Sequence, residues 1–140
     1  MRFLDSSVFL HAYLAPRRRL SQREAQVKER AKSIIERIDA GSEEVLTTVI
    51  HVAEIANIVE ARLGLQTSLR VAARILSLEN IRVAGVTEED YEKALATASR
   101  YTVSLNDALA YIKMMEHGVE EVYTFDKHFK NLPGIKIVQE

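Results

Sequence analysis

The stretch VYTFDKHFKNLPGIKIV, residues 122–138, holds two short apolar runs on either side of a polar turn. The runs Val122–Phe125 and Ile135–Val138 are mostly apolar, without strict alternation of polar and apolar residues, as is typical of strands buried in a parallel sheet. The pair Pro133-Gly134 marks a turn before the second run. The stretch therefore predicts two buried strands at the end of the chain.

The same pattern extends back through the sequence. Three further apolar runs predict strands at Arg2–Leu4, Val45–Val49 and Ile81–Val86. Helical patterns lie between the strands, at Ser7–Leu14, Gln22–Ala40, His51–Leu63, Thr67–Leu78, Glu88–Arg100 and Leu105–His117. Strands that alternate with helices in this way predict a three-layer α/β domain with a mainly parallel five-stranded sheet flanked by helices.

Length and composition set the remaining bounds. A chain of 140 residues with 47% hydrophobic and 28% charged residues is typical of one globular domain, expected here over residues 1–140. The absence of cysteine excludes disulfides and thiolate metal sites. No run resembles a signal peptide or a membrane span, so a cytoplasmic protein is expected. The net charge of −1 gives no general attraction to nucleic acid, so such binding would need a local patch or a bound cation.

Acidic residues follow the expected strands at their carboxyl ends. Asp5 comes directly after the first strand, and Asp126 directly after VYTF. Ligands of open α/β sheets bind beyond the carboxyl ends of the strands, where the strand order reverses. Each of these residues also suits the N-cap of a following helical turn. For either residue taken alone a cap is the commoner role, so the case for a site depends on the acids together.

Glu54 lies in a helical stretch, HVAEIANIVEARL, between the apolar neighbours Ile50 and Ile58 at four-residue spacing. A helix that is apolar on both sides is partly buried, and a buried carboxylate needs a partner or a metal. Several carboxylates at one edge of a sheet would repel one another strongly. Bound divalent cations would relieve that repulsion.

Asp107 lies in VSLNDALAY, residues 103–111, where Ser104 and Asp107 have the spacing of a capping box. The stretch Thr87–Asp90 has the same form and indicates no function. The motif alone therefore does not decide whether Asp107 only caps a helix or also takes part in chemistry.

Four segments together resemble the PIN-domain nucleases, and most closely the VapC-type toxins. They are FLDSSVFL (3–10), VIHVAEIANI (49–58), SLNDALA (104–110) and VYTFDKHFKNLPGIKIV (122–138), so the resemblance spans nearly the whole chain. It is most specific in the last two segments. The resemblance implies a PIN-like domain in which an acidic quartet serves as catalytic and metal-binding residues: Asp5, Glu54, Asp107 and Asp126.

Metal-dependent hydrolysis of phosphodiesters is the chemistry expected of such a quartet. Carboxylates alone repel a phosphate, whereas one or two bound Mg²⁺ or Mn²⁺ ions make them a cationic template that activates water. Oxygen ligands and the lack of cysteine favour these ions over zinc. Ser7 and Thr124 are expected to support the acids rather than bind metal.

The resemblance also implies a substrate and partners. It implies endonucleolytic cleavage of RNA, leaving a 3′-hydroxyl and a 5′-phosphate, by the toxin of a VapBC-type toxin–antitoxin pair. The partners would be a VapB-like antitoxin and a second copy of the chain. The helix expected at residues 51–63 carries apolar residues on more than one face, and that surplus surface also favours a homodimer.

Basic and imidazole side chains leave their roles open. The basic residues gather in residues 17–32, which fit the variable clip region of these toxins; they could contact RNA, the antitoxin or only solvent. The four histidines show no metal-ligand spacing. His128 lies close to Asp126 in the sequence, although a surface role is favoured for it.

Two other acidic α/β classes fail on particular residues. A response-regulator receiver needs an Asp at the end of its third strand, where this chain has VAGVT. A haloacid-dehalogenase phosphatase needs an Asp two residues after the first, where this chain has Ser7. The serious alternative is a non-catalytic PIN-like module that binds RNA or protein, and the presence of all four acids favours the enzyme.

Overall fold

The sheet has five strands, all parallel, in the order β3-β2-β1-β4-β5. The computed structural model describes all 140 residues. The predicted five-stranded sheet is confirmed, and it is entirely rather than mainly parallel. The strands are β1 (Arg2–Leu4), β2 (Val45–Thr48), β3 (Ile81–Ala84), β4 (Glu121–Tyr123) and β5 (Lys136–Val138).

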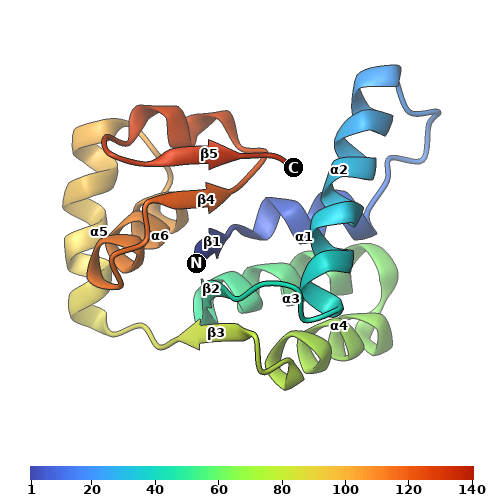
Figure 1. The fold of residues 1–140 in the computed structure, drawn as a ribbon, viewed down its shortest axis with the longest axis horizontal. Helices are drawn as coiled ribbons and strands as arrows, with labels where there is room; N and C mark the ends of the chain where they lie inside the picture. Colours follow the sequence, from blue (N-terminus) through green and yellow to red (C-terminus); the bar gives the residue numbers. More distant parts are fainter.

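Helices cover both faces of the sheet, which confirms the predicted three layers. Helices α1 to α4 lie on one side and α5 and α6 on the other (Figure 1). None of the helices combines the length and the apolar character needed to cross a membrane. The helices are α1 (Ser6–Tyr13), α2 (Gln22–Asp39), α3 (Val49–Leu63), α4 (Leu65–Ser77), α5 (Glu88–Tyr101), α6 (Leu105–Glu116) and the short 3₁₀ helix η1 (Lys127–Asn131).

Successive residues of the central strands are buried on opposite faces of the sheet, because neighbouring side chains of a strand point in opposite directions. Phe3 of β1 and Val122 of β4 are fully buried beneath α6 and η1. The residues that follow them, Leu4 and Tyr123, are fully buried in the core beneath α1 to α4. Both faces of β1 and β4 are therefore dry, which explains why their sequences are apolar without strict alternation.

The strand order reverses between β1 and β4. The chain builds outward from β1 through β2 to β3, and then crosses to the other side of β1 to form β4 and β5. Strands β1 and β4 pair in register, with Leu4 opposite Tyr123, and the Asp5 N–H donates to the Tyr123 carbonyl at 3.0 Å. The carboxyl ends of these two strands thus lie side by side at the point where α/β sheets bind ligands.

Most expected boundaries differ from the structure by one or two residues, and the cap of α3 shows why. The strand expected at Val45–Val49 ends at Thr48, whose hydroxyl accepts hydrogen bonds from the N–H groups of Ile50 and His51. Because this side chain caps the helix, α3 begins at Val49 instead of His51. Similarly, the strand expected to reach Phe125 ends at Tyr123.

The apolar surface expected to be in surplus on residues 51–63 is covered within the chain over the middle of the helix. Ile55 and Val59 of α3 are buried in the core shared with α4, and Ile50 packs against the cluster formed by α5 and α6. Exposed large apolar residues remain at the two ends of α3, where Val49 is 43% and Leu63 is 48% exposed, and on α4, where Leu69 is 54% and Leu76 is 61% exposed. The surplus on α3 is therefore confined to the ends of the helix, because neighbouring helices cover its middle.

Part of the basic stretch stabilises the fold. The Arg18 guanidinium makes two hydrogen bonds to the Glu24 carboxylate, at 2.8 and 2.9 Å. Lys28 Nζ donates to carbonyl oxygens at the C-terminus of α1, among them that of Leu14 at 3.1 Å. Arg18 and Lys28 therefore contribute to the fold, whereas Arg23 and Arg30 take part in no ion pair with an acid.

Helices α5 and α6 are held together by a buried ion pair. Lys113 Nζ of α6 lies 2.9 Å from the Asp90 carboxylate of α5, and both side chains are 8% exposed. Hydrogen bonds from the backbone at Thr87, followed by the bond from Lys113, lower the pKa of Asp90. Asp90 therefore caps α5 and also joins it to α6.

This dual role predicts that Asp90 matters more for stability than an ordinary cap. Asp90→Ala should lower the free energy of unfolding by about 3 kcal/mol, near the low end for a broken buried ion pair because Glu116 still pairs with Lys113. Thr87→Ala removes only a capping hydroxyl and should cost about 1 kcal/mol. Urea unfolding of both variants checks this, and equal losses would contradict a role for the ion pair.

Candidate metal centre

Two stretches have the spacing of a capping box with Asp as its acid, and the structure separates them. In the first, the Thr87 hydroxyl accepts from the Asp90 N–H at 3.2 Å, and the Asp90 carboxylate accepts from the Thr87 N–H at 2.8 Å. In the second, the Ser104 hydroxyl accepts from the Asp107 N–H at 3.1 Å, but the Asp107 carboxylate does not return the bond. The Asp107 side chain is therefore not used as the acid of a capping box.

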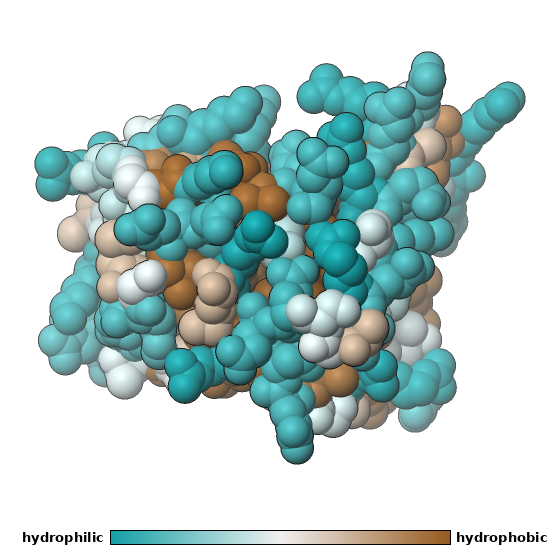
Figure 2. Space-filling view, in the orientation of Figure 1, coloured by the Kyte–Doolittle hydropathy of each residue, from teal (hydrophilic) through white to brown (hydrophobic).

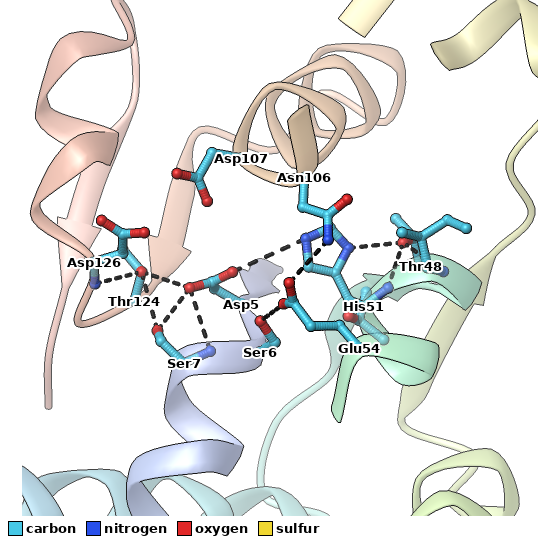
Figure 3. Close-up of polar contacts among 12 residues, drawn as sticks. Asp5, Ser6, Ser7, Thr48, His51, Glu54, Asn106, Asp107, Thr124 and Asp126 are labelled. Atoms are coloured by element: carbon cyan, nitrogen blue, oxygen red, sulfur yellow. Dashed lines mark hydrogen bonds and ion pairs between the residues drawn. The ribbon is translucent and has the colours of Figure 1, made fainter. Parts of the chain in front are cut away.

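The Asp107 carboxylate points instead toward those of Asp126 and Asp5 (Figure 3). Its Oδ2 atom is buried and has no hydrogen-bond partner. One carboxylate oxygen each from Asp107 and Asp126 and one ring nitrogen of His128 all lie within 4.8 Å of one another. Two acids predicted from the sequence are thus brought together by the start of α6 and the start of η1.

His128 is closer to this group than a purely surface role requires. Its side chain is 57% exposed, and its Nδ1 atom lies 3.0 Å from Asp126 Oδ1. The same Asp126 oxygen accepts from the His128 N–H at 2.9 Å, so Asp126 also caps η1, as its position allowed. The side chain lies at the surface, as the sequence favoured, and it also approaches the site.

Asp5 is held rigidly between α1 and β4. Its Oδ2 atom accepts from the hydroxyls of Ser7 and Thr124 at 2.6 and 2.8 Å, and more weakly from the Ser7 N–H at 3.4 Å. Those hydroxyls in turn accept from the backbone N–H groups of Phe125 and Asp126 at 3.0 Å each. Ser7 and Thr124 therefore support the acid as expected, and they leave Asp5 Oδ1 without a hydrogen bond.

Glu54 reaches the other side of Asp5 from α3 (Figure 3). One of its carboxylate oxygens accepts from the Ser6 hydroxyl, and the other accepts from the Asn106 side-chain amide at 2.9 Å. Both oxygens thus have a donor, and Glu54 lies outside the group formed by Asp107, Asp126 and His128. The structure brings the four acids to one edge of the sheet but gives Glu54 different neighbours from the other three.

His51 forms the floor of the site. It is fully buried, and its Nδ1 atom lies 2.7 Å from the Thr48 hydroxyl. That hydroxyl already accepts from two backbone N–H groups, so its own proton must point to Nδ1. In the neutral ring the remaining proton is then on Nε2, which faces Asp5 Oδ1 at 3.9 Å. His51 therefore directs a polar hydrogen at the free oxygen of Asp5.

Burial and mutual repulsion dominate the electrostatics. Burial, followed by repulsion from the carboxylates of Asp126 and Asp5, raises the pKa of Asp107 to about 7. Burial also raises the pKa of Asp5, against the opposing effects of His51 and of the hydroxyls of Ser7 and Thr124. Burial lowers the pKa of His51, which favours the neutral ring.

We call Asp5, Asp107 and Asp126 the carboxylate cluster. The oxygen atoms of the carboxylate cluster are suitable ligands for a hard divalent cation. Asp107 Oδ2 is a buried acceptor without a donor, which costs free energy unless something fills the place of the missing partner. Asp5 Oδ1 is likewise without a hydrogen bond. Carboxylate oxygens in this number suit Mg²⁺ or Mn²⁺ better than a soft metal. The free oxygens of these three acids are the atoms that could hold such an ion.

Sequence reasoning missed the residues that hold the acids in place. Ser6 and Asn106 fix Glu54 across 48 and 52 positions of the chain, and no local pattern reveals contacts of that range. Asn106 directly precedes Asp107, which was the one available signal. His51 lies three positions before Glu54, a helical spacing that places both on one side of α3.

Comparison with known proteins agrees with this geometry. Among solved structures, the chain is similar to the Mycobacterium tuberculosis toxin VapC20, which cleaves the sarcin–ricin loop (TM-score 0.77, 23% identity, 100% of both chains covered). It is also similar to a toxin–antitoxin complex from Klebsiella pneumoniae (TM-score 0.64, 16% identity, 99% of this chain and 96% of that chain). A third similar structure is PAE2754 from Pyrobaculum aerophilum (TM-score 0.56, 15% identity, 98% and 88%).

These structural likenesses show the fold, since their sequence identities are low. None of the curated proteins matches the chain in sequence. The sequence model of the PIN domain, however, matches residues 2–135, which include strands β1 to β4 and all four predicted acids. The chain therefore belongs to the PIN domain family.

Proposed function

We propose that this protein is a metal-dependent endoribonuclease that hydrolyses RNA phosphodiesters. Its catalytic, metal-binding residues are Asp5, Glu54, Asp107 and Asp126, and its cofactor is Mg²⁺ or Mn²⁺. PIN domains are typically nucleases that use divalent metals, and the sequence of this one retains four acids at one edge of the sheet. The observation that carries the proposal is the buried, unpartnered Oδ2 atom of Asp107, which lies beside two further carboxylates.

Each residue of the site has a distinct part in this proposal. The carboxylate cluster, together with Glu54, would hold the cation, which when bound would supply an activated water and offset the charge of the phosphate. Ser7 and Thr124 occupy Asp5 Oδ2 and so keep its other oxygen free. Ser6 and Asn106 fix the Glu54 carboxylate, which is then rigid before any substrate binds.

The second candidate, a non-catalytic PIN-like module that binds RNA or protein, needs no unpartnered carboxylate. Such a module gains nothing from Asp107, whose burial and repulsive neighbours raise its pKa to about 7. A structural acid at that position would be expected to close the capping box, as Asp90 does. The cost of keeping Asp107 in the cluster therefore favours an enzyme.

We also propose that the protein is the toxin of a VapBC-type pair and that a VapB-like antitoxin inhibits it. The support is the similarity to VapC20 and to a toxin–antitoxin complex. A basic side chain of the antitoxin would fit the carboxylate cluster, because a guanidinium binds carboxylates through two hydrogen bonds and would compete with the cation.

Cleavage of RNA is the direct test. With Mg²⁺ or Mn²⁺ the protein should cut single-stranded RNA to fragments with 5′-phosphates, and EDTA should stop the reaction. Asp5→Asn should reduce cleavage to background. Asn106→Ala, which frees Glu54 without removing an acid, should lower the rate by about 10–100-fold, as expected for loss of a supporting hydrogen bond at a metal site.

The matched control is Glu120→Gln, an exposed acid just before β4, whose loss should leave cleavage unchanged. If a gene for a small antitoxin adjoins this chain's gene, its product should suppress cleavage when it is added. Equal cleavage by wild type and Asp5→Asn would reveal a contaminating nuclease and overturn the proposal. Tight RNA binding without any cleavage would support the non-catalytic module.

The raised pKa of Asp107 predicts a dependence of stability on pH. Between an unfolded pKa of about 3.9 and the folded value near 7, the folded protein holds the extra proton, so its stability falls as pH rises through this window. Asp107→Asn removes this titration. We therefore compare the two proteins without metal. The free energy of unfolding of wild type should fall by roughly 3 kcal/mol more than that of Asp107→Asn between pH 5 and pH 8. The melting temperature of the variant should accordingly rise relative to that of wild type over this range.

The same two proteins test whether Asp107 binds metal. Mg²⁺ should raise the melting temperature of wild type at pH 8, and this rise should shrink in Asp107→Asn, because a weaker site contributes less binding free energy to the folded state. An Asp107→Asn protein that is less stable at every pH, with an unchanged response to Mg²⁺, would show that the residue has only a structural role.

We further propose that the chain forms a homodimer through α4. Leu65, Leu69 and Leu76 lie at spacings of four and seven residues, on one side of the helix, and are 52%, 54% and 61% exposed. Light scattering should give a mass of twice 15.8 kDa for wild type, and Leu69→Glu/Leu76→Glu should give a monomer. Leu95→Glu, which removes an equally exposed leucine from α5, should remain a dimer. A monomeric wild type would contradict the proposal.

A further inference from the structure

A polar hollow in the surface lies beside the carboxylate cluster. Its volume is about 350 Å³, and its lining includes His11 of α1, Arg23 and Arg30 of α2, Phe125 and Gln139. In Figure 2 the surface has a notch between α2 and the end of the chain after β5, with hydrophilic side chains along its borders. None of the residues that line the hollow is acidic.

Phe125 and His11, which form the floor of the hollow, are connected to the carboxylate cluster along the chain and through hydrogen bonds. Phe125 directly precedes Asp126, and its N–H donates to the Ser7 hydroxyl that supports Asp5. His11 lies one helical turn after Ser7 on α1, so both are on the same side of that helix. A polymer that lies over the acids would therefore reach this hollow within a short distance.

Two unpaired arginines give the hollow its charge. Arg23 and Arg30 are exposed and lie seven residues apart, two turns along one side of α2. The acids nearest to them in the helix pair elsewhere, Glu24 with Arg18 and Glu29 with Lys32. No carboxylate neutralises either guanidinium, and both line the same space.

The floor offers aromatic rings. Phe125 is partly exposed, and the His11 ring meets it edge-on, with centroids 5.6 Å apart and planes at 74°. Gln139 closes one side, where its Nε2 atom donates to the Thr124 carbonyl at 3.3 Å. Aromatic rings next to arginines are what single-stranded nucleic acid needs, because bases stack on the rings and phosphates bind the guanidinium groups.

We propose that this hollow binds a nucleotide of single-stranded RNA that flanks the cleaved phosphodiester. Its base lies against Phe125 and His11, and its phosphates bind Arg23 and Arg30. The proposal rests on the proposed ribonuclease activity, since the carboxylate cluster marks where the strand is cut. It also implies a preference for single strands, because bases stacked and paired in a duplex cannot enter the hollow. Part of the basic stretch 17–32 then contacts RNA, while Arg18 and Lys28 stabilise the fold.

Equilibrium binding without metal tests the arginines separately from cleavage. The probe is a short fluorescein-labelled single-stranded RNA, measured by anisotropy in EDTA. Arg23→Gln/Arg30→Gln should weaken binding by about tenfold, as expected for two lost phosphate contacts. The slope of log affinity against log salt should also fall by about 1.4, or about 0.7 for each contact.

The matched control is Arg17→Gln/Arg19→Gln. It removes the same charge from two exposed arginines of the adjoining loop that do not line the hollow. Its affinity should stay within about twofold of wild type and its salt slope should change less, because only close phosphate contacts release counterions fully. Equal losses in the two double variants would show general attraction to basic residues and would overturn the proposal.

Phe125→Leu tests stacking while keeping an apolar side chain in place. Its affinity for the same RNA should fall by about fivefold or more. A 2-aminopurine base in the probe should be quenched on binding to wild type and less so on binding to Phe125→Leu, and a purely structural role would leave this signal unchanged. Thermal unfolding of the variant verifies that it is folded. Unchanged quenching in a folded variant would overturn the stacking role.

The two proposals fail in different ways. If wild type cuts RNA but the hollow variants bind RNA as wild type does, the hollow is not a nucleotide site and the ribonuclease proposal stands. If wild type binds RNA through the hollow and cuts none with Mg²⁺ or Mn²⁺, the nucleotide site stands and the ribonuclease proposal fails. If the arginines prove necessary only for binding a protein partner, the RNA site is overturned.

Discussion

The parallel pairing of β1 with β4 is the constraint on which the rest of the structure depends. With Leu4 opposite Tyr123, the residues after the two strands, Asp5 and Thr124, come within hydrogen-bonding distance at 2.8 Å. One hydroxyl bond then fixes Asp5 and, through the Asp126 N–H at 3.0 Å, the start of η1. A slip of one residue would turn every side chain of β4 to the other face and take this contact apart.

The site is stable despite its charge because the acids are distributed among different kinds of neighbours. Asp5 receives hydroxyl donors on one oxygen, Glu54 receives a hydroxyl and an amide, and the Asp107 carboxylate keeps a fully buried oxygen without a donor. The electrostatic cost is greatest where donors are fewest, at Asp107, whose pKa rises to about 7. The fold can tolerate one such group, because at neutral pH it need not be fully ionised when no cation is bound.

Periodicity and composition were enough to predict the layers, all five strands and the edge at which the acids gather, because strand ends and helix order follow from the local sequence. They were insufficient to predict the exact ends of the helices and strands, since a threonine such as Thr48 is equally suited to a strand and to a helix cap. They also could not tell Asp90 from Asp107, which share one motif. The difference lies in distant partners, Lys113 for one and the carboxylate cluster for the other.

The distance between β1 and β4 along the chain has a consequence for biosynthesis. The chain emerges from the ribosome in sequence order, so β1, β2 and β3 can associate first, whereas β4, which completes the centre of the sheet, can join only after them. Until residues 121–126 emerge, Asp5 lacks Thr124 and the cluster lacks Asp126. A chain on which residues 121–126 have not yet folded onto β1 therefore carries no assembled carboxylate cluster.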